Sequence, residues 1–302
     1  MAYLTKGTGP ILVTGGSGQL ATSLAQRGGP RIRIAGRPEF DFADPETLKT
    51  ILEQVKPVAV VNAAAWTAVD LAETEIAGAE AANRDGPAAL AALCAQADIP
   101  FIHVSTDYVF AGDKGQPYVE TDPVSPQTVY GRTKVEGEEK ILQLCQNAII
   151  LRTSWVYSAH GKNFVRTMIA AGAKNPTLKV VGDQRGNPTS SDDLADAILA
   201  ILDLIEDKGW NSNYAGLYHA CGSGEATWHE LANETLKYAA EHGQKMPEVL
   251  AIATADWPTP AKRPADSRMD NRKLHNVFGI QMPDWRSSVK KAVDRIFHPS
   301  PD

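Results

Sequence analysis

The segment ILVTGGSGQLA, residues 11–21, decides the fold. Its first residues form a short apolar run typical of a buried strand, and a helical pattern begins at about Gln19. Between them the letters match G-x-x-G-x-x-[G/A]. Gly15 permits a tight reversal, Gly18 lets a pyrophosphate touch the backbone, and the small Ala21 lets helix and strand pack closely. The free N–H groups of the helix N-terminus attract a diphosphate. An ordinary glycine-rich turn is the alternative, but its place at the first strand–helix junction favours a dinucleotide site.

Apolar runs alternate with helical patterns in the first half of the chain. Strands are predicted at 11–13, 31–35, 58–61, 101–104 and 148–152. Helices are predicted at 19–26, at 45–55 with Asp44 as N-cap, at 86–97, and from about Ser125-Pro126 onward. Short connections between such elements predict a parallel sheet covered on both faces, which is a Rossmann-type, doubly wound α/β fold.

The second half loses this regular alternation. Helices are predicted at 164–171, 192–206 and 227–241 and from about Trp285, with an extended, proline-containing loop at 253–268. We therefore expect a dinucleotide-binding domain at 1–155, with a return segment at about 188–218. A smaller C-terminal α/β substrate lobe is expected at 156–187 and 219–302. The crevice between the two is the expected ligand site.

Composition excludes several classes of function. The 302 residues are 43% hydrophobic and 22% charged, as in a soluble globular protein. The balance of 30 basic against 36 acidic residues, a net charge of −6, argues against a nucleic-acid partner. No apolar stretch reaches the roughly 20 residues of a membrane span, and residues 1–10 lack the apolar core of a signal peptide. The widely spaced Cys94, Cys145 and Cys221 suggest reduced thiols and a cytoplasmic location.

The end of the second predicted strand indicates which dinucleotide binds. NAD-binding proteins place a carboxylate about 20 residues after the glycine turn, but this chain has Ala35-Gly36-Arg37 there. Arg37 is suited to pair with a 2′-phosphate, which favours NADPH over NADH, although a solvated surface arginine is the plain alternative. The residues predicted to bind the cofactor in this half are Gly15, Ser17, Gly18, Gln19, Leu20, Arg37, Asp41, Phe42, Ala63, Ala64 and Ala65.

A tyrosine and a lysine lie one helical turn apart. Tyr130 and Lys134 form Y-x-x-x-K in a helix pattern, so both side chains share one face. A nearby ammonium would lower the phenol pKa toward the working range and could hold the nicotinamide ribose, so both residues also count as cofactor-binding. Thr106 follows the strand predicted at 101–104, where this architecture places reacting groups. His103, inside that strand, is interpreted as a core histidine.

These motifs together resemble the extended short-chain dehydrogenase/reductase superfamily and, within it, the dTDP-4-dehydrorhamnose reductase family. The resemblance spans nearly the whole chain. It is carried by NAAAWTAVDLAE at 62–73, STDYVF at 105–110, YGRTKVEGE at 130–138, RTSWVYSAHGKNF at 152–164, GDQRGNPT at 182–189, GLYH at 216–219 with TW at 227–228, and RPADSRM at 263–269.

The resemblance implies a reaction and a set of site residues. Hydride would pass from the nicotinamide to C4 of a dTDP-4-keto-6-deoxyhexose, with Thr106, Tyr130 and Lys134 as the catalytic set. Tyr130 would protonate the alkoxide while Thr106 polarises the carbonyl. The implied substrate contacts are Thr67, Thr106, Asp107, Trp155 and Asn163.

One departure from the family pattern concerns metal. Some bacterial members bind magnesium at a dimer interface through acidic side chains, one at the position of Ser23. Serine is a poor ligand for a hard cation, so no metal is expected, and the chain is expected to be a monomer or a homodimer.

Two other functions stay open. Dehydratases of the superfamily have Asp-Glu after the catalytic threonine, whereas this chain has Asp107-Tyr108. That difference leaves a reductase of another nucleotide-linked 4-keto-6-deoxysugar as one alternative. A non-catalytic NADP-binding regulatory subunit of the same family is the other, although the intact Thr106, Tyr130 and Lys134 argue against it.

Overall fold

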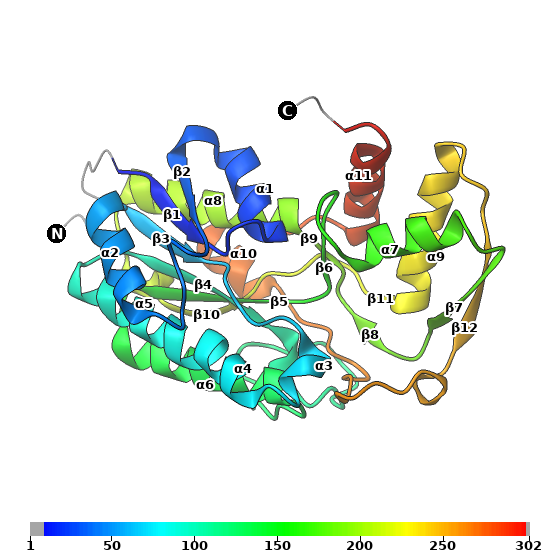
Figure 1. Cartoon of the computed structure of the whole chain (residues 1–302), viewed down its shortest axis with the longest axis horizontal. Coiled ribbons are helices and arrows are strands. Elements are labelled where there is room, and N and C mark those ends of the chain that lie inside the picture. The colour runs from blue at the N-terminus through cyan, green and yellow to red at the C-terminus, as the bar shows by residue number, and fades with distance from the viewer. Residues whose placement is uncertain (1–8, 300–302) are drawn as a thin grey trace.

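The computed structural model describes residues 9–299, and a six-stranded parallel sheet forms its larger part (Figure 1). The strand order is β10-β5-β4-β3-β1-β2. The bounds are β1 (Ile11–Thr14), β2 (Ile32–Ala35), β3 (Ala59–Asn62), β4 (Phe101–Thr106), β5 (Ala148–Thr153) and β10 (Gly216–His219). The predicted doubly wound α/β fold is thereby confirmed. The prediction that residues 1–10 hold no signal peptide falls almost wholly outside the described residues.

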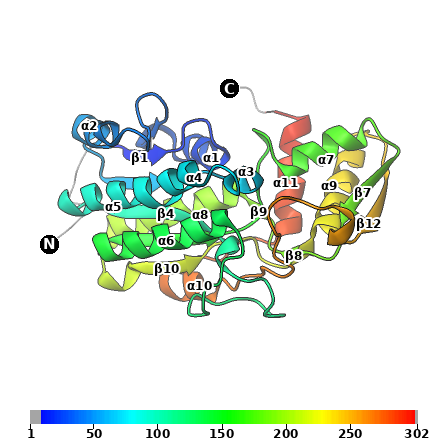
Figure 2. The ribbon, with the colours of Figure 1, turned by 60° about the horizontal axis from the view of Figure 1, so that its bottom comes forward.

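Helices cover both faces of the sheet because its strands are apolar on both sides. One face packs on α1 (Gln19–Gly28), α8 (Ser191–Lys208) and α10 (Arg272–Phe278), with Val13 and Ile198 in the shared core. The other packs on α2 (Pro45–Val55), α5 (Gly86–Gln96) and α6 (Val129–Leu144), with Leu12 and Phe101 in its core. In Figure 2, α5 and α6 lie side by side across this second face.

Two predicted helix starts have different outcomes. The helix at 45–55 is confirmed, and the Asp44 side chain accepts a hydrogen bond from the Glu46 N–H. The start at Ser125-Pro126 is wrong, because α6 begins at Val129 and Thr128 caps it by accepting from the Gly131 N–H at 3.0 Å. The Ser125 N–H donates instead to the Val109 carbonyl, which holds this segment outside the helix.

The chain between β3 and α5 has helical structure that was not predicted. Two short helices, α3 (Val69–Ala72) and α4 (Ile76–Glu80), lead into a π-helical turn at Ala81–Asp85. Such turns often mark functional sites. Here α6 crosses the turn at Gly137, where a Cβ would lie 2.1 Å from the Asn83 carbonyl oxygen. Glycine at this crossing therefore sets how closely α6 approaches, and with it the position of Tyr130.

A smaller α/β lobe forms the other end of the molecule (Figure 1). Tyr157, Leu231 and the fully buried Trp285 lie in its core. Its short strands pair as β6 with β9, β8 with β11 and β7 with β12. The bounds are β6 (Val156–Tyr157), α7 (Phe164–Gly172), β7 (Thr177–Val181), β8 (Arg185–Gly186), β9 (Thr189–Ser190), β11 (Ala226–Thr227), α9 (Trp228–Glu241), β12 (Glu248–Ile252) and α11 (Trp285–Phe297).

The C-terminal third does not stay in one lobe. Leu274 on α10 and Met282 pack in the core of the large sheet, although both fall in the range expected for the substrate lobe. The division of the chain into two domains stays a prediction. Within residues 9–299, no helix combines the length and the apolar character that a membrane span requires.

Gly137→Ala tests the crossing of α6 over the π-helical turn. We expect the added methyl group to lower the free energy of unfolding by about 1–3 kcal/mol through overpacking, although alanine favours a helix by about 0.5–1 kcal/mol. Chemical denaturation measures the change. Glu139→Ala, at an exposed position of the same helix, is the control. An unchanged or increased stability of Gly137→Ala would contradict the close contact.

Candidate active site

A cleft of about 910 Å³ lies at the carboxyl edge of the large sheet and gathers nearly all the predicted site residues. The glycine turn after β1 and the alanines after β3 line its inner wall, at the point where the strand order reverses. Such a reversal is the usual ligand site of an open α/β sheet. The predicted residues that line it are Gly15, Ser17, Gly18, Gln19, Leu20, Arg37, Asp41, Phe42, Ala63, Ala64, Ala65, Thr67, Thr106, Asp107, Tyr130, Lys134 and Trp155.

The glycine turn leaves room for a ligand against bare backbone. Gly15 has φ 111°, and a Cβ there would lie 3.0 Å from the Ala63 backbone. A Cβ at Gly36 would lie 2.7 Å from the Gly16 Cα, so β2 also closes tightly on the turn. Gly18 caps α1 without a side-chain hydrogen bond. The first N–H groups of α1 are thus open to a phosphate.

Two hydroxyl groups that line the cleft are buried without a hydrogen-bond partner among the described residues. Ser105 Oγ and Thr153 Oγ1 come from the ends of the adjacent strands β4 and β5, and neither has a hydrogen-bond partner within residues 9–299. Both residues line the cleft. Since buried polar groups are normally paired, these hydroxyls fit a bound polar molecule. With the bare glycine turn, they make the cleft suitable for a dinucleotide.

Arg37 lies just after β2. Its side chain is 80% exposed and contacts Asp41, with 3.2 Å between Arg37 Nε and Asp41 Oδ2. The rings of Phe40 and Phe42 meet edge to face beside it, and all four residues line the cleft. An exposed guanidinium held by one carboxylate is free to meet a phosphate. The role of Arg37 in choosing the cofactor stays a prediction.

Tyr130 lies almost fully buried on α6, facing the end of β4. Burial raises its pKa above the usual tyrosine range, Asp107 and Tyr108 add to the rise, and the Thr106 hydroxyl opposes it. Lys134 is not among the groups that shift this pKa in the free protein, so its effect on Tyr130 stays a prediction. The Lys134 amine is instead directed at the Val104 carbonyl, 2.6 Å away, and at His103 Nε2, 3.1 Å away. The raised pKa favours the protonated form of Tyr130 in the free protein.

Lys134 is also buried, at 1% exposure, although its type is rarely found inside a protein. Burial lowers its pKa to about 8, and Glu138 opposes the shift. His103 lies in the core, as expected, but it contacts Lys134, which the interpretation as a core residue did not foresee.

Asp107, which directly follows β4, is 2% exposed and lines the cleft. Its carboxyl accepts hydrogen bonds from Thr106 at 3.1 Å and from Ser267 at 2.5 Å. Burial raises its pKa to about 6 in spite of these bonds. Ser267 belongs to the RPADSRM segment, so that segment of the C-terminal part of the chain reaches the end of β4.

Two tryptophans stack at the lobe side of the cleft. Trp155 and Trp228 have ring centroids 3.7 Å apart and an interplanar angle of 8°. Gly186 makes room for the pair, since a Cβ there would lie 2.6 Å from the Trp155 ring. Trp228 was not predicted as a site residue, because nothing in the sequence relates it to Trp155 some 70 residues earlier.

Asn163 does not line the cleft. Its side chain caps α7 by accepting from the Arg166 N–H at 3.1 Å, and it donates to the Ser158 carbonyl at 2.9 Å. Ser158 in turn donates to Gln19 Oε1 at 2.8 Å. Asn163 thus holds a turn that joins the small lobe to α1, and a direct contact with substrate stays a prediction.

Ser23, at the position of the family's magnesium ligand, lies buried between α1 and α8. Its hydroxyl contacts Ser191 Oγ at 2.8 Å and Asp192 Oδ1 at 2.6 Å. In the part of the chain that the structure describes, no three His, Cys, Asp or Glu side chains group so as to hold a metal ion. The absence of a magnesium site stays a prediction.

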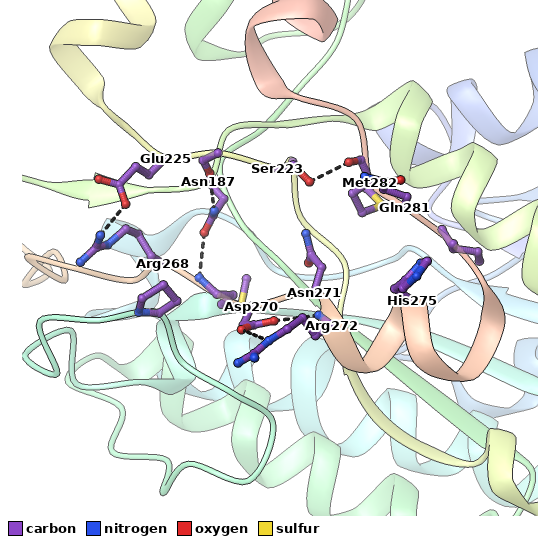
Figure 3. Close-up of a pocket in the computed structure, with 15 residues that line it drawn as sticks. Asn187, Ser223, Glu225, Arg268, Asp270, Asn271, Arg272, His275, Gln281 and Met282 are labelled. Carbon is purple, nitrogen blue, oxygen red and sulfur yellow. Dashed lines mark hydrogen bonds and ion pairs between the residues drawn. The ribbon is translucent and has the colours of Figure 1, made fainter.

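A second pocket, of about 510 Å³, lies apart from the predicted site residues (Figure 3). Its charged side chains pair with one another or with close neighbours: Arg268 with Glu225 and Asp266, and Arg272 with Asp270. The Asn187 amide is also engaged, with the Gly224 carbonyl and the Met269 N–H. These groups point to a structural role, so the chemistry is assigned to the larger cleft.

A glycine turn at the strand reversal, with Thr106, Tyr130 and Lys134 beside it, defines a dinucleotide-dependent reductase of the short-chain type. Comparison with known proteins narrows the class. The model of the RmlD substrate binding domain family matches residues 9–297. A dTDP-4-dehydrorhamnose reductase of Sinorhizobium fredii is 42% identical over 285 residues, which are 94% of this chain and 96% of that protein. The chain belongs to the dTDP-4-dehydrorhamnose reductase family.

Solved structures of dTDP-4-dehydrorhamnose reductases have the same fold as this chain. The crystal structure of a Clostridium acetobutylicum dTDP-4-dehydrorhamnose reductase has a TM-score of 0.86 at 35% identity, covering 94% of this chain and 98% of that one. The Bacillus anthracis dTDP-4-dehydrorhamnose reductase, crystallised in complex with NADP, has a TM-score of 0.86 at 30% identity, covering 97% and 99%.

Asp107→Asn tests the burial of the carboxyl group. An unfolded Asp107 loses its proton near pH 3.8, whereas the folded one keeps it to about pH 6. The wild type therefore loses stability as the pH rises through this window, by about 3 kcal/mol at most. We expect Asp107→Asn to be more stable than the wild type above about pH 6 and similar below about pH 4. Denaturation curves at several pH values measure the difference, with the exposed Asp207→Asn as control. Parallel pH dependences in wild type and Asp107→Asn would contradict the shift.

Proposed function

We propose that this protein reduces the C4 keto group of dTDP-4-dehydro-L-rhamnose to give dTDP-L-rhamnose, with NAD(P)H as reductant. The observation that carries the proposal is the meeting of Thr106, Tyr130 and Lys134 in one cleft with the dinucleotide-type glycine turn. Membership of the dTDP-4-dehydrorhamnose reductase family over almost the whole chain supports the sugar nucleotide as substrate.

Different residues of the cleft would bind different parts of the cofactor. The N-terminus of α1 with Gly15 and Gly18 would hold the diphosphate, and Arg37 with Asp41 and Phe42 the adenosine end. Ala63–Ala65, Ser105 and Thr153 would surround the nicotinamide ribose and ring. When bound, the reduced nicotinamide supplies the hydride to C4.

The protein supplies the proton and the orientation. Tyr130, protonated because it is buried, donates its phenolic proton to the oxygen that develops negative charge. Thr106 hydrogen-bonds the same oxygen and so stabilises the developing charge. Lys134, one turn along α6, is suited to hold the nicotinamide ribose and to stabilise the tyrosinate that remains.

The sugar nucleotide would lie between the strand ends and the small lobe. Thr67 and Asp107 line the cleft on the sheet side, and the stacked pair of Trp155 and Trp228 offers an apolar surface on the lobe side. Asn163 would act through the turn that it holds. We also propose a cytoplasmic location, in keeping with the buried free thiols of Cys94, Cys145 and Cys221.

The direct test supplies purified protein with NADPH and enzymatically generated dTDP-4-dehydro-L-rhamnose and follows the loss of NADPH absorbance. Formation of dTDP-L-rhamnose is the expected result. Turnover only with another nucleotide-linked 4-keto-6-deoxysugar would favour the first alternative function. Binding of NADPH without turnover on any of these sugars would favour the regulatory subunit.

Tyr130→Phe tests the proton donor. We expect kcat to fall by about 100-fold or more, because general acid catalysis contributes a factor of that order, while the affinity for NADPH changes little. Steady-state kinetics and fluorescence titration measure the two quantities. Tyr214→Phe removes a hydroxyl group outside the cleft and serves as control. Near-normal turnover by Tyr130→Phe would remove the tyrosine from the mechanism.

Arg37→Ala tests the choice of cofactor. We expect KM for NADPH to rise about tenfold or more, as the loss of a charge-assisted hydrogen bond predicts, and KM for NADH to stay the same. The ratio of kcat/KM for the two cofactors is the measurement. Equal effects on both cofactors, or a wild type that prefers NADH, would contradict a contact between Arg37 and a 2′-phosphate.

A further inference from the structure

Four buried side chains form a continuous hydrogen-bonded row from β1 to the catalytic helix. Thr14 Oγ1 donates to Asn62 Oδ1 at 2.6 Å, Asn62 Nδ2 lies 2.9 Å from His103 Nδ1, and His103 Nε2 lies 3.1 Å from Lys134 Nζ. The first three are fully buried, and Lys134 is 1% exposed. The row crosses the sheet from β1 through β3 and β4, directly below the cleft.

The backbone fixes the orientation of the Asn62 amide. Its oxygen receives both the Thr14 hydroxyl and the Ala64 N–H, the latter at 3.2 Å. Reversing the amide would set its NH₂ group against the Ala64 N–H, donor against donor. The Asn62 NH₂ group therefore faces His103 and donates to Nδ1, so that the proton of a neutral imidazole lies on Nε2.

This tautomer determines which protonation state of Lys134 can form a hydrogen bond with His103. The His103 Nε2–H points at Lys134 Nζ, so the lysine nitrogen must accept a hydrogen bond, which an ammonium cannot do. An uncharged amine accepts from His103 and still donates to the Val104 carbonyl at 2.6 Å. Burial acts in the same direction on the pKa of Lys134.

The charged groups around Lys134 do not offset this arrangement. Glu138, one turn along α6, is the acid that raises the pKa of Lys134, but both its oxygens accept from Arg152 of β5, at 2.9 and 2.6 Å. On the π-helical turn that packs against α6, Arg84 pairs with Asp85. On α6, Arg132 pairs with Glu136 and with Glu80 of α4, and Lys140 pairs with Asp85, while Glu139 is exposed to solvent.

We propose that Asn62 and His103 are positioning residues that stabilise the uncharged amine form of Lys134 in the free protein by fixing the tautomer of the imidazole between them. Movement of Lys134 away from His103 toward a ligand in the cleft favours its ammonium form, and the added proton comes from solvent. In the free protein the row therefore makes Lys134 easier to deprotonate than a lysine in water. The proposal rests on the proposed function only where it concerns turnover, since the state of the free protein is measurable without it.

Asn62→Asp is the decisive variant. A carboxylate there accepts from Thr14, from Ala64 and from a His103 Nδ1–H, so the tautomer reverses and Nε2 becomes an acceptor for an ammonium. Long-range ¹H–¹⁵N spectra of histidine-labelled protein report the tautomer, and ¹³C-labelled lysine reports the titration of Lys134, both without ligand. We expect a neutral His103 protonated on Nε2 in the wild type and on Nδ1 in Asn62→Asp. The pKa of Lys134 should rise by about one unit or more.

His103→Asn keeps the test possible if Asn62→Asp does not fold. The shorter amide still reaches Asn62 but withdraws the N–H from Lys134, so the pKa of Lys134 should again rise. His219→Asn is the matched control, because His219 is equally buried and neither ring nitrogen has a hydrogen-bond partner within residues 9–299. It should alter stability and leave the titration of Lys134 unchanged.

Activity gives an independent readout. If Lys134 must be charged for turnover, the alkaline limb of kcat/KM should move to higher pH in the Asn62 and His103 variants by the same amount as the titration, and stay in place in His219→Asn. A wild-type His103 protonated on Nδ1 or on both nitrogens overturns the proposal. So does a Lys134 titration that neither variant moves. If no substrate is turned over, the spectra still decide the inference, while the proposed function fails separately.

Discussion

The close approach of three backbone segments at the carboxyl edge of the sheet is the constraint on which the rest of the structure depends. Gly15 packs against the Ala63 backbone, and Gly36 against Gly16, at distances that leave no space for a Cβ at Gly36 and very little at Gly15. Because these contacts occur where the strand order reverses, they leave the N-terminus of α1 bare above the sheet. A diphosphate bound there would be held by backbone rather than by side chains. The place of the cofactor then determines where Thr106, Tyr130 and Lys134 must lie.

Local sequence signals were sufficient for the strands β1 to β5 of the large sheet and for α2. The strands at the centre of the sheet are apolar on both faces. The helix α2 (Pro45–Val55) has its cap and its proline at the standard positions, so its hydrophobic period and its capping residues predict the same helix. The start of α6 was misplaced because Ser125-Pro126 and Thr128 are both acceptable caps. A backbone hydrogen bond from Ser125 to the distant Val109 decides between them, and such a bond has no signature in the sequence.

The parts of the site that the sequence missed depend on long-range geometry. Ser105 and Thr153 become notable only when β4 and β5 align and leave both hydroxyls buried without partners. Trp228 becomes a site residue only by stacking on Trp155. Asn163 lies outside the cleft and caps α7, a local use that an asparagine just before a helix also suggests, and its contact with substrate stays a prediction. The apolar strand around His103 predicts a core residue, and His103 is buried. Its contact with Lys134 follows only from the packing of α6 on the sheet.

The structure alters how the charged residues of the sequence are interpreted. The chain carries a net charge of −6, yet both proposed ligands are polyanions, so attraction must come from local groups. Sequence alone offers the N-terminus of α1, Arg37 and Lys134 for this purpose. The buried Lys134, with its lowered pKa and its contact with His103, contributes less positive charge than a free lysine. The exposed Arg37 and the bare helix terminus would therefore supply most of the attraction for the proposed anionic ligands. Lys134 is then free to serve the proton chemistry beside Tyr130, where a permanent charge is not needed before the ligand arrives.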